Sequence, residues 1–391
     1  TFGGIFMGAM HVFISGVMLV RNDGLSIPEI VGRYLGGGMR QFMRVFSIIL
    51  LILVGVVFLR SPASILHGLL PDISYLWWIA IIIVYYFMAT LLPVDKIIGQ
   101  LYPLFGFALI FMALGLMGVI FFGDYTVPEI TDLHNSQPNP SAMPIVPTLF
   151  ITIACGAISG FHATQSPLMA RCVNNERECR SVFYGAMIAE SIIALVWAAI
   201  AMAFFGGADG LSQAMVEHGN DAAWAVNTIS RTTLGLVGGI LAVLGVVAAP
   251  VTSGDTAFRS ARLIIADIFH IDQRSKLKRL YISIPLFAVG LGLTFVDFDV
   301  VWRYFSWTNQ ALATIVLWSI VVYLNLGRRN IWVALLPAIF MTYICASFVF
   351  VSSQFVGLGA TATAYLCGGA ATLVILVIMI YKLRKDAKMS A

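Results

Sequence analysis

The sequence predicts an all-α integral membrane protein with about eleven transmembrane helices. Three observations carry this prediction: the composition, the length of the apolar segments and the placement of the basic residues. Hydrophobic residues make up 60% of the 391-residue chain and charged residues 11%, with a mean hydropathy of +0.92. Soluble domains are about 45–50% apolar and about 25% charged. The lipid bilayer is therefore the expected partner of much of the surface.

Each predicted helix is a largely apolar segment, since a bilayer core is spanned by about 20 such residues. Together they are expected to form a single transmembrane domain over residues 1–391. The segments are residues 1–20, 45–59, 75–92, 101–122, 148–170, 182–205, 234–251, 280–295, 311–326, 331–351 and 362–381.

Basic residues alternate between the two sides of these predicted helices. Twenty of the 23 Lys and Arg residues fall in one set of connections and in the C-terminal tail, whereas the opposite connections hold only Arg60, Arg231 and Arg303. Cytoplasmic loops are the ones rich in Lys and Arg. We therefore expect the C-terminus to be cytoplasmic.

Several other classes of protein are not indicated. The net charge of +4 forms no basic face that would fit nucleic acid. No HExxH, GxSxG or P-loop pattern points to an enzyme, and no cofactor is expected. The five cysteines form no CxxC pair, so no disulfide or metal framework is predicted. The chain opens inside an apolar segment without an initiator Met, and we expect residues upstream of it.

The segment 148–170 is the richest in polar groups, which are costly inside lipid. Pro167 removes a backbone donor, and broken membrane helices are tolerated where they line a cavity. We therefore predict a broken helix that binds solute. The alternative is that the GxxxG spacing of Gly156 and Gly160 only allows close helix packing. The predicted solute-binding residues are Gly156, Ser159, Gly160, His162, Thr164, Gln165 and Ser166.

Glu190 lies midway along the segment 182–205. A carboxylate there can carry a proton, because desolvation favours its neutral form. The equal alternative is a structural hydrogen bond made by a neutral acid.

Thr252, Ser253 and Asp255 follow the segment 234–251 and offer hard oxygen ligands for Na⁺ or a proton relay. The alternative for Asp255 is a helix cap. Residues 255–270 predict an interfacial helix, with apolar residues gathered near one face.

Asn309 and Gln310 open the segment 311–326 and are expected to cap it or to face a cavity as secondary site residues. His11 is expected to be a packing histidine with satisfied hydrogen bonds.

Two stretches resemble the carbon starvation protein A family. One is FITIACGAISGFH, residues 150–162, and the other is APVTSGDTAFRSAR, residues 249–262. Weaker similarities surround Glu190, residues 308–310 and residues 22–29. The resemblance extends over essentially the whole chain.

The resemblance implies a bacterial inner-membrane secondary transporter that takes up peptides or pyruvate, with an inverted-repeat fold like that of the leucine transporter. In that fold the segment 148–170 corresponds to the sixth helix, which is broken, and the segment 234–251 to the eighth. Thr252 and Ser253 would then correspond to hydroxyls of a sodium site. Solute would lie between these two helices and a first helix absent from this sequence. The family usually has Asp after the helix histidine, whereas Val12 follows His11 here.

The predicted function is therefore uptake of a small polar carbon source, coupled to H⁺ or Na⁺. Two alternatives remain: a nutrient sensor that binds solute without moving it, and a passive channel. The cytoplasmic loops are too short for the partner-binding domain a sensor would need. No ring of repeated pore residues supports a channel.

Overall fold

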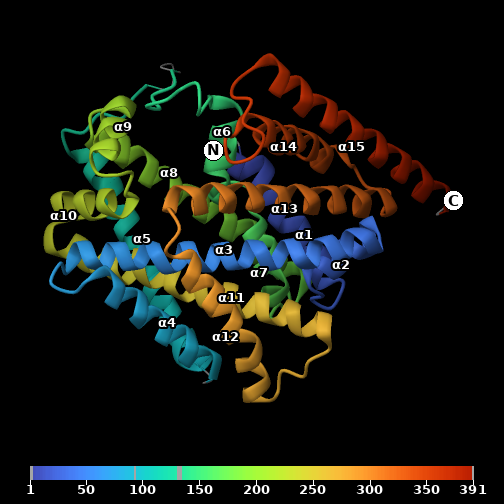
Figure 1. Cartoon of the computed structure of the whole chain (residues 1–391), viewed down its shortest axis with the longest axis horizontal. Helices are drawn as coiled ribbons and strands as arrows, with labels where there is room; N and C mark the ends of the chain where they lie inside the picture. The colour runs from blue at the N-terminus through green and yellow to red at the C-terminus, as the bar shows by residue number, and fades with distance from the viewer. Residues whose placement is uncertain (1–2, 92–93, 130–133, 390–391) are drawn as a thin grey trace. The chain divides into compact units, whose positions relative to one another are not determined.

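The computed structural model describes residues 3–91, 94–129 and 134–389, with only the backbone for 94–102, 154–155 and 387–389. The predicted opening at Thr1 and the side chains of Lys96 and Cys155 lie outside what is described. Helices dominate these ranges, and no strand occurs in them. Figure 1 shows the helices in chain order.

Fifteen α-helices and five shorter helical segments follow one another along the described chain. The five segments are the π-helical Gly3–Gly8, Arg180–Gly185 and Ala242–Val247 and the 3₁₀-helical Ile153–Gly156 and Glu176–Glu178. The α-helices are α1 (Ala9–Val20), α2 (Ile27–Leu35), α3 (Gly37–Leu69), α4 (Tyr75–Leu91), α5 (Val94–Phe122), α6 (Ile145–Thr152), α7 (Gly160–Ala170), α8 (Ala186–Phe204), α9 (Ala208–Glu217), α10 (Ala222–Leu241), α11 (Ala248–Phe269), α12 (Lys276–Leu293), α13 (Phe298–Leu326), α14 (Trp332–Val351) and α15 (Ala362–Met389).

Eight helical stretches of the described chain are long and apolar enough to cross a membrane. They are Gly3–Val20, Gly37–Leu69, Pro103–Phe122, Glu176–Phe204, Ala222–Phe269, Phe298–Leu326, Trp332–Val351 and Ala362–Asp386. The predicted count of eleven is not confirmed. Among the other predicted segments, α4 has only 17 residues, 148–170 is divided between α6 and α7, and α12 begins with basic residues.

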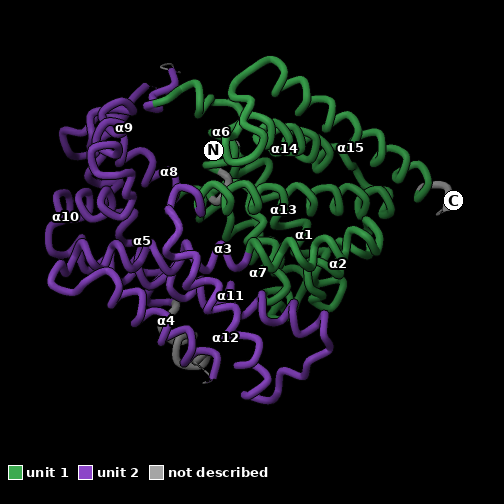
Figure 2. Tube along the Cα trace, in the orientation of Figure 1, with its two compact units in different colours: residues 1–50, 139–192, 302–391 green, residues 51–138, 193–301 purple. Residues whose placement is uncertain are grey.

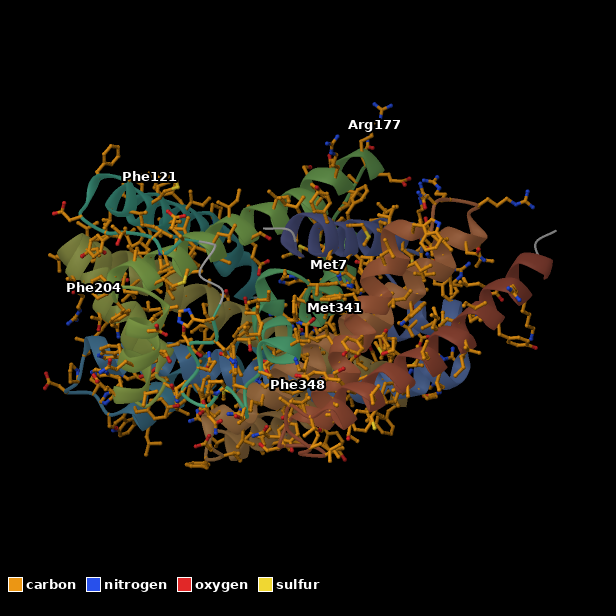
Figure 3. All side chains as sticks on the ribbon, turned by 90° about the horizontal axis from the view of Figure 1, so that it is seen from above. Met7, Phe121, Arg177, Phe204, Met341 and Phe348 are labelled. Carbon is orange, nitrogen blue, oxygen red and sulfur yellow. The ribbon has the colours of Figure 1, made fainter. Side chains whose placement is uncertain are left out.

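Large apolar side chains on these helices are exposed, as expected of a lipid-facing surface. Phe121 is 73% exposed and projects away from the ribbon (Figure 3). Arg177, in the 3₁₀ segment Glu176–Glu178, also projects outward (Figure 3).

The chain forms two compact units (Figure 2). Unit 1 comprises residues 1–50, 139–192 and 302–391, and unit 2 comprises residues 51–138 and 193–301. Each unit is therefore assembled from segments that are distant in sequence. The expectation of a single transmembrane domain stays a prediction.

In unit 1 the most deeply buried helix is α13, whose Leu312, Val316 and Ile320 are fully buried. The indole Nε1 of Trp307 donates to the carbonyl of Cys345 on α14 at 3.1 Å, and that of Trp318 donates to Oγ1 of Thr342 at 3.0 Å. A buried indole N–H needs such an acceptor. The α14 helix in turn packs against α15 and α6 (Figure 1).

In unit 2 one apolar cluster joins α5, α8 and α10 through Met112, Leu116, Ile200 and Ile229. A second contact is built around the ring of Phe258 on α11. A Cβ on Gly55 or on Gly290 would collide with that ring, so glycine lets α3 and α12 approach α11 closely.

The predicted end of a helix at 251 and the start of a separate one at 255 are wrong. The α11 helix runs without a break from Ala248 to Phe269, and a backbone kink occurs earlier, at Gly235 in α10 (φ 58°, ψ −141°). Asp255 therefore caps no helix. That residues 255–270 lie at the membrane interface stays a prediction.

Candidate functional site

The predicted broken helix is confirmed. The α6 helix ends at Thr152, a 3₁₀ turn runs to Gly156, and α7 begins at Gly160. Ser159 has extended backbone angles (φ −131°, ψ 129°) and serves as the N-cap residue of α7. The break thus falls at residues 157–159, inside the polar stretch singled out in the sequence.

The exposed backbone at the break is satisfied from α13. Oδ1 of Asn309 accepts hydrogen bonds from the backbone N–H of Phe161 at 2.7 Å and from the hydroxyl of Ser159 at 3.2 Å. The first N–H groups of a helix lack partners inside the helix. A fully buried amide therefore performs the task usually done by the N-cap side chain.

This role corrects the expectation for Asn309. The α13 helix begins at Phe298, not near residue 311, so Asn309 and Gln310 lie in its interior and cannot cap it. Gln310 is fully buried, and neither atom of its side-chain amide has a hydrogen-bond partner in the described part of the chain.

Close packing surrounds the break on two sides. A Cβ on Gly160 would collide with the carbonyl of Asn309 and come within 2.8 Å of Cβ of Leu312. A Cβ on Gly8 would collide with the carbonyl of Ala157, and Oγ of Ser191 on α8 donates to the carbonyl of Gly156 at 3.1 Å. Gly160 therefore allows α7 to pack closely against α13, and its solute-binding role stays a prediction.

Most polar side chains of α7 bond within their own helix. Oγ1 of Thr164 donates to the carbonyl of Phe161 at 2.7 Å, and Oγ of Ser166 donates to that of His162 at 2.8 Å. Nε2 of Gln165 lies 3.4 Å from Oγ1 of Thr164. Both hydroxyls are buried, which leaves His162 and Gln165 as the partly exposed polar side chains of the predicted set.

His162 and Glu190, which the sequence singled out separately, form a pair. Nε2 of His162 lies 3.2 Å from Oε2 of Glu190, and the two side chains are 22% and 45% exposed. The pair joins the first turn of α7 to α8 inside unit 1. An imidazole and a carboxylate at this distance can share or exchange one proton.

His11 on α1 lies near this pair. It is fully buried, and a charge on His162 acts on it electrostatically. Neither ring nitrogen has a hydrogen-bond partner among the described residues. The expectation of burial was correct, whereas the expectation of satisfied hydrogen bonds was wrong.

The predicted ion ligands lie in unit 2, on α11. Oγ1 of Thr252 donates to the carbonyl of Ala249 at 2.9 Å. The carboxylate of Asp255 accepts from Arg259, one turn further along α11, at 2.8 Å. Asp255 is 9% and Arg259 23% exposed as side chains. A cation at Asp255 would have to compete with this guanidinium.

Arg21, which follows α1, connects three parts of unit 1. Its Nε donates to the carboxylate of Glu176 at 2.7 Å, and Nη1 donates to the hydroxyl of Tyr323 on α13 at 2.9 Å. The hydrogen bond to Glu176, followed by that to Tyr323, raises the pKa of the guanidinium above its ordinary value. Sequence analysis did not identify this tie, because its members are separated by 155 and 302 positions.

Comparison with solved structures places the fold among membrane transporters. The inward-facing conformation of Mhp1, a transporter of the leucine-transporter fold, matches 99% of this chain and 83% of its own length with a TM-score of 0.55 and 16% identity. A manganese transporter of Eremococcus coleocola, in a mutant form, matches 100% of this chain and 88% of its own, with a TM-score of 0.52 and 13% identity. This likeness concerns the fold alone.

The sequence comparisons define the family. Residues 64–238 match the carbon starvation protein CstA family. An uncharacterized membrane protein of Haemophilus influenzae is 37% identical over 264 residues, which are 54% of this chain and 71% of that protein. The chain belongs to the carbon starvation protein CstA family and is a multi-pass bacterial membrane transporter.

Two named relatives are similar over shorter stretches. A peptide transporter CstA of Helicobacter pylori is 31% identical over 167 residues, or 41% of this chain and 23% of that protein. The pyruvate/proton symporter BtsT of Escherichia coli is 36% identical over 115 residues, or 29% of this chain and 16% of that protein.

Proposed function

We propose that this chain carries out secondary active uptake of a small polar carbon source, a peptide or pyruvate, coupled to H⁺. The observation that carries the proposal is the His162–Glu190 pair beside the break between α6 and α7. The names of the relatives, peptide transporter and pyruvate/proton symporter, support both the substrate class and the coupling ion.

The proposed solute site is the break itself. Asn309 and Gln310 on α13 are its secondary members. Its main members remain Gly156, Ser159, Gly160, His162, Thr164, Gln165 and Ser166. Because Asn309 already accepts the hydrogen bonds of Ser159 and Phe161, direct contact with solute at those groups requires a rearrangement of the break. His162 and Gln165 provide polar contacts that need no such change.

Proton coupling is proposed because both groups of the pair, the imidazole and the carboxylate, can bind a proton. One bound proton changes the charge of the pair by +1. The protonated His162–Glu190 pair is the form that we propose to be present when the transporter carries its solute inward.

Na⁺ at Thr252, Ser253 and Asp255 is the second candidate for coupling. The Asp255–Arg259 ion pair disfavours it, because the guanidinium neutralises the carboxylate that a cation would use. Substitution of Thr252→Val together with Ser253→Ala tests this candidate. Unchanged Na⁺ dependence of uptake would exclude these hydroxyls as coupling ligands.

The test of the proposed function is uptake and counterflow in proteoliposomes, with pyruvate and L-alanyl-L-alanine as radiolabelled solutes. Each is measured with and without an inward pH gradient and with and without Na⁺. We expect counterflow of one solute and accumulation driven by the pH gradient. Binding without counterflow would indicate a sensor, and downhill flux without counterflow or accumulation would indicate a channel.

A further inference from the structure

Unit 2 contains a cavity of about 280 Å³ between the C-terminal part of α3 and the start of α10. It lies in unit 2, whereas the proposed solute site lies in unit 1. Ligand pockets in proteins are commonly about 300–1,000 Å³. This cavity is therefore suited to a molecule the size of an amino acid or a very short peptide. Its polar lining includes Ser64, His67, Asp221, Asn227 and Arg231.

Three residues that carry hydrogen-bond acceptors line the cavity. Asp221 is held in place, because Oδ1 accepts from the N–H of Ala223 at 2.8 Å and Oδ2 accepts from the hydroxyl of Ser64 at 3.0 Å. A carboxylate has about four lone-pair sites, so acceptor capacity remains.

Asn227 provides the second acceptor. Its Nδ2 donates to the carbonyl of Ile65 at 3.1 Å, which fixes the orientation of the amide. Its Oδ1 has no hydrogen-bond partner in the described part of the chain, although the residue is only 8% exposed. This oxygen is closed to solvent, so it could accept from a ligand only after a local rearrangement of the amide.

His67 provides the third. Its Nδ1 lies 2.8 Å from the carbonyl of Ile73 and must therefore carry the proton that is donated. In the neutral ring Nε2 is then an acceptor. A primary ammonium group has three N–H donors and could donate to both Asp221 and His67.

Arg231 supplies the opposite charge. Its Nη2 donates to the carbonyl of Leu69 at 3.1 Å, and its other N–H groups remain available to a ligand. Arg231 and Asp221 line the same cavity but form no ion pair with each other among the described residues. Two opposite charges that line one cavity without pairing complement a ligand that carries both charges.

We propose that this cavity is a second binding site, specific for a small zwitterion whose primary ammonium group contacts Asp221 and His67 and whose carboxylate contacts Arg231. A free α-amino acid and a dipeptide carry both groups. The ammonium group of a phosphatidylethanolamine headgroup has the same donor chemistry. Pyruvate has no ammonium group and would be excluded.

The test is equilibrium binding of L-alanyl-L-alanine to the purified full chain in detergent. N-acetyl-alanyl-alanine, alanyl-alaninamide and pyruvate serve as comparison ligands. We expect Asp221→Asn to weaken binding at least tenfold, because charge-assisted hydrogen bonds are the strong ones. Asn keeps an oxygen that can accept the capping bond from Ala223, so we expect the fold to be retained. Arg231→Gln should also weaken binding, whereas Asp72→Asn, on an exposed carboxylate outside the cavity, should not.

The variant His162→Ala distinguishes binding at the second site from binding at the proposed transport site. The second site should retain its affinity in that variant and lose it in Asp221→Asn. Wild-type affinity in both Asp221→Asn and Arg231→Gln, with unchanged melting temperatures, would overturn the proposal, as would equal binding of the N-acetylated peptide. In nanodiscs, weaker dipeptide binding with phosphatidylethanolamine than with phosphatidylcholine would support the ammonium site and assign its occupant to lipid.

Discussion

Nε2 of His162 lies 3.2 Å from Oε2 of Glu190, so the first turn of α7 and the apolar helix α8 share one titratable pair. Removal of the negative charge should uncouple uptake from the pH gradient. We predict that Glu190→Gln abolishes pH-driven accumulation in proteoliposomes while counterflow of the same solute continues. The matched control is Glu217→Gln on α9, which should behave as wild type. Accumulation at the wild-type level in Glu190→Gln would contradict the coupling role.

The amide of Asn309 supplies the capping acceptor of α7. We predict that Asn309→Ala lowers the free energy of unfolding by about 1–3 kcal/mol, because it leaves the N–H of Phe161 and the hydroxyl of Ser159 without their acceptor. Asn309→Asp keeps an acceptor oxygen and should lose less. Thermal unfolding in detergent compares the two variants, and equal losses would argue against the cap.

Gly160, in the first turn of α7, lies against Asn309 and Leu312 of α13. Gly160→Ala should lower the melting temperature, because the new Cβ would lie 2.8 Å from Cβ of Leu312 and against the carbonyl of Asn309. Gly369→Ala on α15 is the matched control, because a Cβ at that position meets nothing within 4 Å. If both variants melt at the same temperature, the close approach at Gly160 is not limiting.

His134 and Asp209 tie the loop before α6 to α9 within unit 2. Nε2 of His134 lies 3.0 Å from both carboxylate oxygens, and hydrogen bonding, chiefly from His134, holds the pKa of the Asp209 carboxyl below its ordinary value. A group with a lowered pKa stabilises the folded state above its unfolded pKa of about 3.9 and loses this effect as the pH falls through the lowered value.

The loop should therefore stay attached at neutral pH and loosen only below about pH 4. Limited proteolysis of the loop as a function of pH measures this directly. Asp209→Asn should be cleaved faster than wild type at pH 7 and should show little further change on acidification. Similar cleavage of both proteins at pH 7 would show that the contact does not hold the loop.

The break in the segment 148–170 could be predicted from the sequence, because Gly and polar residues interrupt an apolar run that lipid would otherwise favour. Pro167, which also suggested a break, lies inside α7. The side chain that completes the break could not be predicted. Asn309 is about 150 positions from the break, and its polarity made residues 307–310 resemble the start of a helix. In the structure Asn309 is buried inside unit 1 and accepts hydrogen bonds from Ser159 and from the start of α7. Local hydropathy identifies where a helix is interrupted, not which distant side chain completes it.

The wrong boundary near Asp255 has a similar cause. Pro250 and Gly254 are typical helix breakers in sequence. Pro250 falls in the first turn of α11, directly after the π-helical segment Ala242–Val247, where the hydrogen bonding already departs from the regular pattern. Gly254 falls where a Cβ would collide with the hydroxyl of Tyr86 on α4. Asp255 pairs with Arg259, one helical turn further along. Pro250 and Gly254 are therefore compatible with a continuous helix.

The hydrogen bonds of Asn309 have a consequence for exchanging parts between members of the family. The segment 145–170 contains the break, but its cap is encoded on α13. A chimera that takes this segment from a relative replaces the donors at positions 159 and 161 but keeps Asn309 as their acceptor. The segment and the α13 position should therefore be transplanted together, as one inheritable module made of two distant pieces of chain.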